Sequence, residues 1–269
     1  MEKNYSPRGV ILSFSKAILY FGLWLVLQIL VVNLAYSILA LRFPGADAFQ
    51  LTEMMDGLSI ELNIMVGALT VIAVAIIAKI SKSSLTQQAE IKKYPGQFTL
   101  TLLIMGVAAA YAIMLIFTLL ELAKVFPDSW ISAQEQNYAD IYTASPFMQF
   151  ISVGFVAPVM EEILFRGCIL GTLKKEMHPW IAIAVSSVLF AVAHGTPIGI
   201  IYTLALGVIM GWLTVTFKSI VPSILFHAAY NCTVAYSGGV SLGIAILSLP
   251  ILAFEIYSIK NYFNRGKEQ

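Results

Sequence analysis

The chain has 269 residues, of which 59% are hydrophobic and 12% are charged, and its formal net charge at pH 7 is +1. Soluble domains typically carry about 25% charged residues, so this composition is typical of a membrane protein. The small net charge argues against a nucleic-acid partner. We expect one integral membrane domain over residues 1–269.

Long apolar runs recur along the chain, and they predict an all-α polytopic membrane protein. The first run is longer than the core of a signal peptide, so we expect it to remain as a membrane anchor. The two most polar intervening segments, 42–57 and 128–145, are expected to be loops, and the second is either a lid or a plain connection. Eight membrane-spanning helices are expected, at residues 17–41, 58–80, 98–125, 147–173, 180–194, 197–217, 220–236 and 240–263.

Basic residues are distributed unequally between the loops of this eight-helix arrangement. With a cytoplasmic start, thirteen of the 16 lysines and arginines fall on the cytoplasmic side, and the exceptions are Arg42, Lys124 and the intramembrane Arg166. Short loops rich in lysine and arginine stay in the cytoplasm. We therefore expect both termini to be cytoplasmic.

The fourth apolar run contains three charged residues, Glu161, Glu162 and Arg166. A charge near the centre of a membrane helix costs about 2.5–3.5 kcal/mol on insertion scales. Glu162 and Arg166 are four residues apart, with the acid first, and this spacing predicts an ion pair on one helix face. Glu161 lies about 100° away around the helix and has no partner there, so it is a candidate general base. The alternative is a charge cluster that only fixes helix packing.

Two histidines lie inside or at the deep end of apolar helices, and each belongs to a four-residue spacing. Phe190 and His194 share one helix face, and His227 and Asn231 share another. A single histidine in a membrane helix more often makes a packing hydrogen bond than takes part in catalysis. Intramembrane polar groups usually face one another or a water-filled cavity, so we expect these side chains to converge with Glu161.

Three motifs thus occur in order on three predicted spans: Glu161-Glu162-x-x-x-Arg166, Phe190-x-x-x-His194 and His227-x-x-x-Asn231. This ordered set resembles the motifs of the CAAX-protease and bacteriocin-processing (CPBP) family, which includes the type II CAAX prenyl endopeptidases. The resemblance implies a family-like catalytic core at about 146–236. It also implies an eight-helix intramembrane endopeptidase whose site is buried between helices 4, 5 and 7.

The resemblance also implies a role for each motif residue. Glu161 and His194 would activate a water molecule for attack on the scissile carbonyl. His227 and Asn231 would stabilise the oxyanion. The substrate would be a membrane-associated peptide or protein, either prenylated with a C-terminal CAAX-like motif or carrying a leader peptide. The residues with a supporting role would be Glu162, Arg166 and Phe190.

Metal dependence is open at the level of the sequence. Glu161, His194 and His227 could form the two-histidine, one-carboxylate set of a catalytic zinc site. The helical His-Glu-x-x-His pattern of zinc peptidases is absent, and the family resemblance favours a glutamate-dependent reaction without a cofactor. We therefore expect no metal, with zinc as the alternative.

The alternative function is non-catalytic: a transporter, or a bacteriocin immunity or scaffold factor that uses the same buried polar cluster. Transport would require a continuous polar path, and the first three predicted spans show no second buried polar cluster from which to build one. The expected partners are the lipid bilayer and a membrane-associated substrate. The expected location is the cell membrane in a bacterium or the endoplasmic reticulum in a eukaryote.

Overall fold

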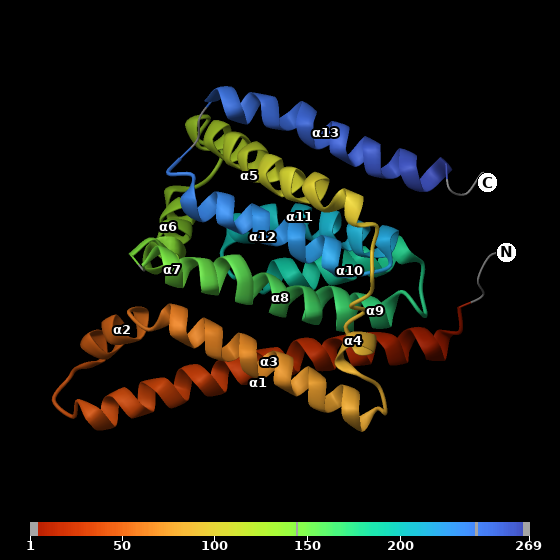
Figure 1. The fold of residues 1–269 in the computed structure, drawn as a ribbon. Helices are drawn as coiled ribbons and strands as arrows, with labels where there is room; N and C mark the ends of the chain where they lie inside the picture. The colour runs from red at the N-terminus through yellow and green to blue at the C-terminus, as the bar shows by residue number, and fades with distance from the viewer. Residues whose placement is uncertain (1–4, 144, 240–241, 266–269) are drawn as a thin grey trace.

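The computed structural model describes residues 5–143, 145–239 and 242–265, apart from the side chains of residues 138 and 140–143. Helices account for nearly all of these residues, and no strand occurs among them. The chain is therefore an all-α polytopic membrane protein, as the sequence predicts (Figure 1).

Five helices within the described ranges are long and apolar enough to cross a membrane. The third of them continues from a short 3₁₀ turn, η1 (Gly96–Phe98). All five coincide with predicted spans, within a few residues at most ends. They are α1 (Pro7–Arg42), α3 (Ser59–Ile80), α5 (Thr99–Leu122), α11 (Pro197–Phe217) and α13 (Leu242–Arg265). The first begins ten residues earlier than predicted, because Ser6 caps it and Pro7 stands in its first turn.

The other three predicted spans are helical but are shorter or irregular. Residues 146–173 form one uninterrupted helical run, in which π-helical turns alternate with α-helical ones. Its parts are α7 (Pro146–Gln149), η2 (Phe150–Val156), α8 (Ala157–Glu161), η3 (Glu162–Leu170) and α9 (Gly171–Leu173). The remaining two are α10 (Pro179–Val192) and α12 (Val221–Tyr236). A total of eight spans remains a prediction.

Both segments that were expected to be loops contain helices, so that prediction is wrong. Asp47 and Gln50 form a capping box that starts α2 (Ala48–Asp56). The second polar segment is α6 (Asp128–Thr143), with an acidic residue in its first turn. Polarity was a poor guide here, because backbone hydrogen bonds and capping side chains can form a short helix whether or not it has an apolar face. The spacing of Trp130, Tyr138 and Tyr142 in this segment is that of membrane-interface aromatics, and the side chains of Tyr138 and Tyr142 lie outside those described.

The helices pack in a sequence of neighbours across the molecule. α1 and α3 lie together on one side, the 146–173 run lies next to them, and α10, α11 and α12 follow (Figure 1). α5 packs between α12 and α13 on the opposite side. Both chain termini emerge at one end of the bundle, together with α4 (Leu85–Gln88) and α9, whereas α2 and α6 lie at the other end.

Candidate active site

The helical run that carries the charged cluster contains a proline that leaves one carbonyl without its helical partner. In the π-helical turn η2, the N–H of Ala157 donates to the carbonyl of Ser152, five residues earlier. By the same spacing, the carbonyl of Val153 would accept from residue 158, which is a proline and has no N–H. The side chain of Asn231 supplies the donor instead, because its Nδ2 lies 2.9 Å from the Val153 oxygen. This bond attaches α12 to the helix that carries the two glutamates.

Glu162 is fully buried and joins two other motif residues. Its Oε1 lies 3.3 Å from NH1 of Arg166 and 3.1 Å from Nδ1 of His227. The predicted ion pair between Glu162 and Arg166 is therefore confirmed. The carboxylate can only accept, so Nδ1 of His227 carries the proton of that hydrogen bond.

Arg166 is also fully buried, and its positive charge is in contact with groups on two further helices. Its guanidinium lies over the ring of Phe190, 4.2 Å from the ring centroid, and donates to the carbonyl of Gly207 at 3.3 Å. An ion pair, a cation–π contact and a carbonyl together offset the cost of burying this cation. Arg166 thereby fixes Phe190 relative to Glu162.

Glu161 has different surroundings from its neighbour. Its side chain is 20% exposed and lines a cavity, whereas Glu162 lies behind the cavity wall. Its Oε2 is 3.7 Å from Nε2 of His227 and has no hydrogen-bond partner among the described residues. One carboxylate is thus held inside the protein, and the other is available to a molecule in the cavity.

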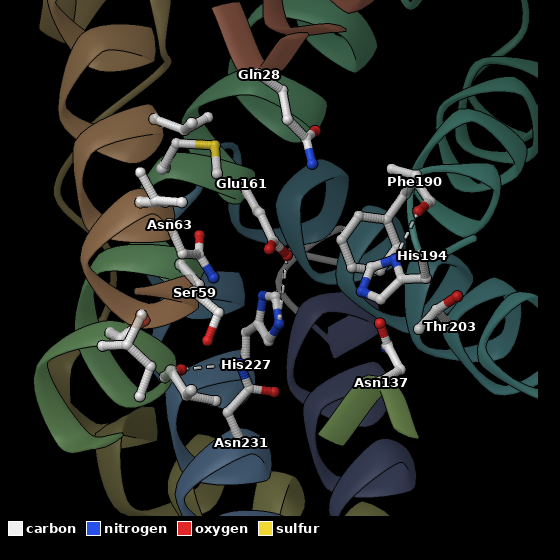
Figure 2. A pocket seen from close by; sticks show the side chains of 18 of the residues that line it. Gln28, Ser59, Asn63, Asn137, Glu161, Phe190, His194, Thr203, His227 and Asn231 are labelled. Carbon is white, nitrogen blue, oxygen red and sulfur yellow. Dashed lines mark hydrogen bonds and ion pairs between the residues drawn. The ribbon is translucent and has the colours of Figure 1, made fainter. Parts of the chain in front are cut away.

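His194 lies just beyond the end of α10 and is held in one tautomer. Its Nδ1 is 2.8 Å from the carbonyl oxygen of Phe190, one helical turn earlier. A carbonyl can only accept, so Nδ1 carries the proton and the neutral ring keeps a lone pair at Nε2. His194 also lines the cavity (Figure 2).

The cavity has a volume of about 560 Å³ and lies between α1, α3, the 146–173 run and α10 to α12. Four predicted catalytic residues and one predicted supporting residue line it, from three separate helical segments. They are Glu161, His194, His227 and Asn231, with Phe190 (Figure 2). The expected convergence of the three motifs is therefore present in the structure. Glu162 and Arg166 support this lining without belonging to it.

Polar side chains that sequence reasoning did not select line the same cavity. α1 contributes Gln28, α3 contributes Ser59 and Asn63, and α6 contributes Asn137 (Figure 2). They do not form a second polar cluster, because they face the site already described. A signal existed in the four-residue spacing of Ser59 and Asn63, which places both on one helix face.

The three residues considered as zinc ligands do not form a metal site in this arrangement. In the described part of the chain, no group of three or more His, Cys, Asp or Glu side chains is placed to hold a metal ion. Glu161, His194 and His227 line one cavity but are not grouped as a ligand set. The residues therefore do not fit a zinc ion in this conformation.

Comparisons with known proteins agree with the motifs. Residues 143–233 match the family described as "Type II CAAX prenyl endopeptidase Rce1-like". The chain is 31% identical over 100 residues to "Putative membrane peptidase YdiL" of Bacillus subtilis (strain 168). The aligned segment covers 37% of this chain and 41% of that protein. The chain is 36% identical over 101 residues to "UPF0177 protein YaiH" of Lactococcus lactis subsp. lactis (strain IL1403), with the same coverage.

These matches confirm the resemblance to the CPBP family for the segment that carries the motifs. The matched segment spans about two fifths of the length of each curated relative. No solved structure matches the chain. At the level of the family, the comparisons support an intramembrane protease.

Proposed function

We propose, from the premise that residues 143–233 are Rce1-like, that the protein is an intramembrane endopeptidase acting on a membrane-associated peptide or protein. One observation carries the proposal. Glu161, His194, His227 and Asn231 line a single cavity, although they come from three helical segments. A carboxylate, two imidazoles and an amide can supply the general base and the oxyanion donors that hydrolysis of a peptide bond uses.

The attacking water is placed by two acceptors. The carboxylate of Glu161 is 20% exposed and lines the cavity, and Nε2 of His194 keeps its lone pair. A water between them donates one hydrogen to each and directs an oxygen lone pair at the substrate carbonyl. Glu161 takes a proton as the oxygen attacks, and it returns that proton to the leaving amine when the C–N bond breaks.

The negative charge that develops on the carbonyl oxygen is stabilised by Asn231 and His227. One N–H of the Asn231 amide is used by Val153, and the second is free to donate to the oxyanion. Nδ1 of His227 donates to Glu162, so a donor at Nε2 requires a ring protonated on both nitrogens. Carboxylate oxygens of Glu161 and Glu162 lie on either side of that ring, 3.7 Å from Nε2 and 3.1 Å from Nδ1.

Phe190 is a positioning residue in this scheme. Its carbonyl fixes the tautomer of His194, and its ring covers the guanidinium of Arg166. Arg166 in turn holds Glu162, which orients His227. The supporting residues therefore act as one connected set behind the cavity.

The cavity extends toward the end of the bundle that carries α2 and α6. Asp56 and Asn137 belong to its lining and are exposed at that end. Basic residues lie in the segments next to α4 and α9 at the opposite end, where Lys93 follows α4 and Lys174 directly follows α9. Since basic loops stay cytoplasmic, we place the cavity mouth on the side away from the cytoplasm. This orientation favours a translocated peptide, such as one with a leader, over a cytoplasmic C-terminal motif.

Peptide hydrolysis by the purified protein tests the proposal. Native chain and Glu161→Gln are reconstituted in proteoliposomes with a library of synthetic peptides, and new peptide termini are identified by mass spectrometry. We expect cleavage by native protein and none by Glu161→Gln. Glu61→Gln is the matched control, because Glu61 is an exposed acid of α3 outside the cavity lining. Cleavage that survives in Glu161→Gln, or folded native protein that cleaves nothing, would overturn the proposal and favour the non-catalytic alternative.

A further inference from the structure

The wall of the cavity formed by α1 and α3 carries polar groups that the reaction itself does not use. Trp24 and Gln28 are one helical turn apart on α1, and both line the cavity. Asn63 lines it from α3. Figure 2 shows the amides of Gln28 and Asn63 pointing into the cavity toward Glu161. We call Trp24, Gln28 and Asn63 the polar wall.

Two cavity-lining side chains are buried without a hydrogen-bond partner. The residue Trp24 is 8% exposed, and its indole Nε1 has no partner within the described ranges. Ser152 is 1% exposed, and its hydroxyl also has no hydrogen-bond partner among the described residues. Buried polar groups are nearly always paired, because desolvation without a partner is costly. Both residues line the cavity, so a bound molecule toward which these side chains turn would supply the missing partners.

The chemistry of the polar wall identifies that molecule. An indole N–H can only donate, and its natural partner is a carbonyl oxygen. The amides of Gln28 and Asn63 each donate and accept, which matches the paired N–H and C=O groups of a peptide backbone. The other side chains of α1 and α3 in the lining are mostly apolar. The wall therefore suits a peptide segment with apolar side chains.

The charges of the lining exclude other ligands. Among the described residues that line the cavity there is no lysine or arginine, whereas Asp56 and Glu161 are acidic. A phosphate headgroup or a free carboxyl terminus would meet these two carboxylates there and no lysine or arginine side chain. An internal, uncharged stretch of peptide meets neither penalty.

We propose that the polar wall binds the backbone of an extended internal segment of the substrate and presents its peptide bond to Glu161. Trp24 donates to a substrate carbonyl, and Gln28 and Asn63 pair with flanking peptide groups. This inference rests on the proposed peptidase function and adds to it the part of the substrate that is recognised. Recognition through the backbone predicts cleavage of internal bonds with limited dependence on side-chain identity.

Kinetics provide the first test. Gln28→Met and Asn63→Leu remove hydrogen bonds at similar volume, and we expect each to raise KM about 3- to 10-fold while kcat changes less than twofold. The probe is a library peptide that native protein cleaves. Asn33→Leu is the matched control, because Asn33 is also an α1 amide but bonds to the carbonyl of Ile29 outside the cavity. Unchanged KM in both wall variants would overturn the proposal and leave the peptidase function intact.

Direct binding provides a test that needs no turnover. In Glu161→Gln with Trp130, Trp180 and Trp212 replaced by Phe, the remaining indole is that of Trp24. A blocked trileucine amide should shift its fluorescence emission saturably, and dodecanol, which has no peptide group, should not. Gln28→Met or Asn63→Leu in that background should weaken the affinity about 3- to 10-fold. An equal response to dodecanol, or unchanged affinity in both variants, would overturn the proposed binding of substrate backbone by the polar wall. Peptide binding by this variant, with no hydrolysis by native protein, would instead overturn only the proposed function.

Discussion

Asn231 donates its side-chain amide to the carbonyl oxygen of Val153 at 2.9 Å, in the turn where Pro158 removes the helical donor. The same amide lines the cavity beside His227. Asn231 is thus part of the packing between two helices as well as a candidate oxyanion donor. Its two roles can be separated, because only the structural one depends on the proline.

The first prediction uses this dependence. Asn231→Ala should lower turnover about 10²–10³-fold, as loss of an oxyanion donor typically does, and should also destabilise the fold. Pro158→Ala restores a backbone N–H for Val153, so in that background Asn231→Ala should cost less stability by about 0.5–1.5 kcal/mol. A double-mutant cycle of unfolding in detergent measures the coupling. Additive losses would contradict the structural role, whereas full activity of Asn231→Ala would contradict the catalytic one.

The two adjacent glutamates should respond differently to the same substitution. Glu161→Gln should abolish turnover and leave stability nearly unchanged, because this side chain faces the cavity. Glu162→Gln should lower the free energy of unfolding by about 3–5 kcal/mol, because it leaves the buried Arg166 without its ion pair. Measurements of thermal unfolding in detergent and of peptide cleavage distinguish the two variants. Equal stability losses in the two variants would contradict this division.

The candidate catalytic motifs were predictable from the sequence because their groups are costly in lipid. Glu161, Glu162 and Arg166 interrupt an apolar run, and such an interruption has few explanations other than a buried site. The pairing of Glu162 with Arg166 followed from helical spacing alone. The contact of Glu162 with His227 did not, since it joins positions 65 residues apart.

Other parts of the site were hidden for identifiable physical reasons. Gln28 and Asn63 are single uncharged amides in apolar runs, and the sequence does not show which face of a helix points inward. The Val153 carbonyl lacks a backbone donor because of the π-helical register, which spacing rules for an α-helix do not include. The sequence does not predict α6, because the polar composition of that helix is typical of a loop.

A third prediction concerns helix packing around the site. A Cβ on Gly106 of α5 would clash with the backbone oxygen of Phe226 on α12. Backbone atoms cannot move aside without a cost in stability. Gly106→Ala should therefore separate these helices and lower the melting temperature by several degrees. Gly22→Ala is the control, because nothing lies within 4 Å of a Cβ built there. That variant should be neutral or slightly stabilising, since alanine favours the helix. A melting temperature for Gly106→Ala equal to that of native protein would contradict the close approach.

The orientation of the cavity mouth gives a fourth prediction. Single cysteines at Lys93 and Lys174 should react with an impermeant maleimide from the cytoplasmic side. Cysteines at Asp56 and Asn137, which line the exposed end of the cavity, should react only from the opposite side. Native Cys168 and Cys232 are replaced by alanine in this experiment. Labelling of positions 56 and 137 from the cytoplasm would place the substrate there and reverse the proposed orientation.

The last prediction concerns the histidines and the metal, because the metal-free and the zinc-dependent mechanisms assign different roles to the histidines. In the metal-free reaction, His194 orients the water through Nε2, and His227 donates to the oxyanion. Chelators should then leave peptide cleavage unchanged, purified protein should hold no stoichiometric metal, and His194→Ala and His227→Ala should lower kcat without altering metal content.

A zinc site would require Glu161, His194 and His227 to approach a common point, which they do not share in this arrangement. Elemental analysis and zinc addition to chelated native protein decide between the mechanisms. About one zinc per chain, with activity that returns on zinc addition, would give the water-activating role to the metal. Asn231→Ala would still be impaired in that case, because a zinc ion bound by these three ligands does not replace the amide that donates to Val153.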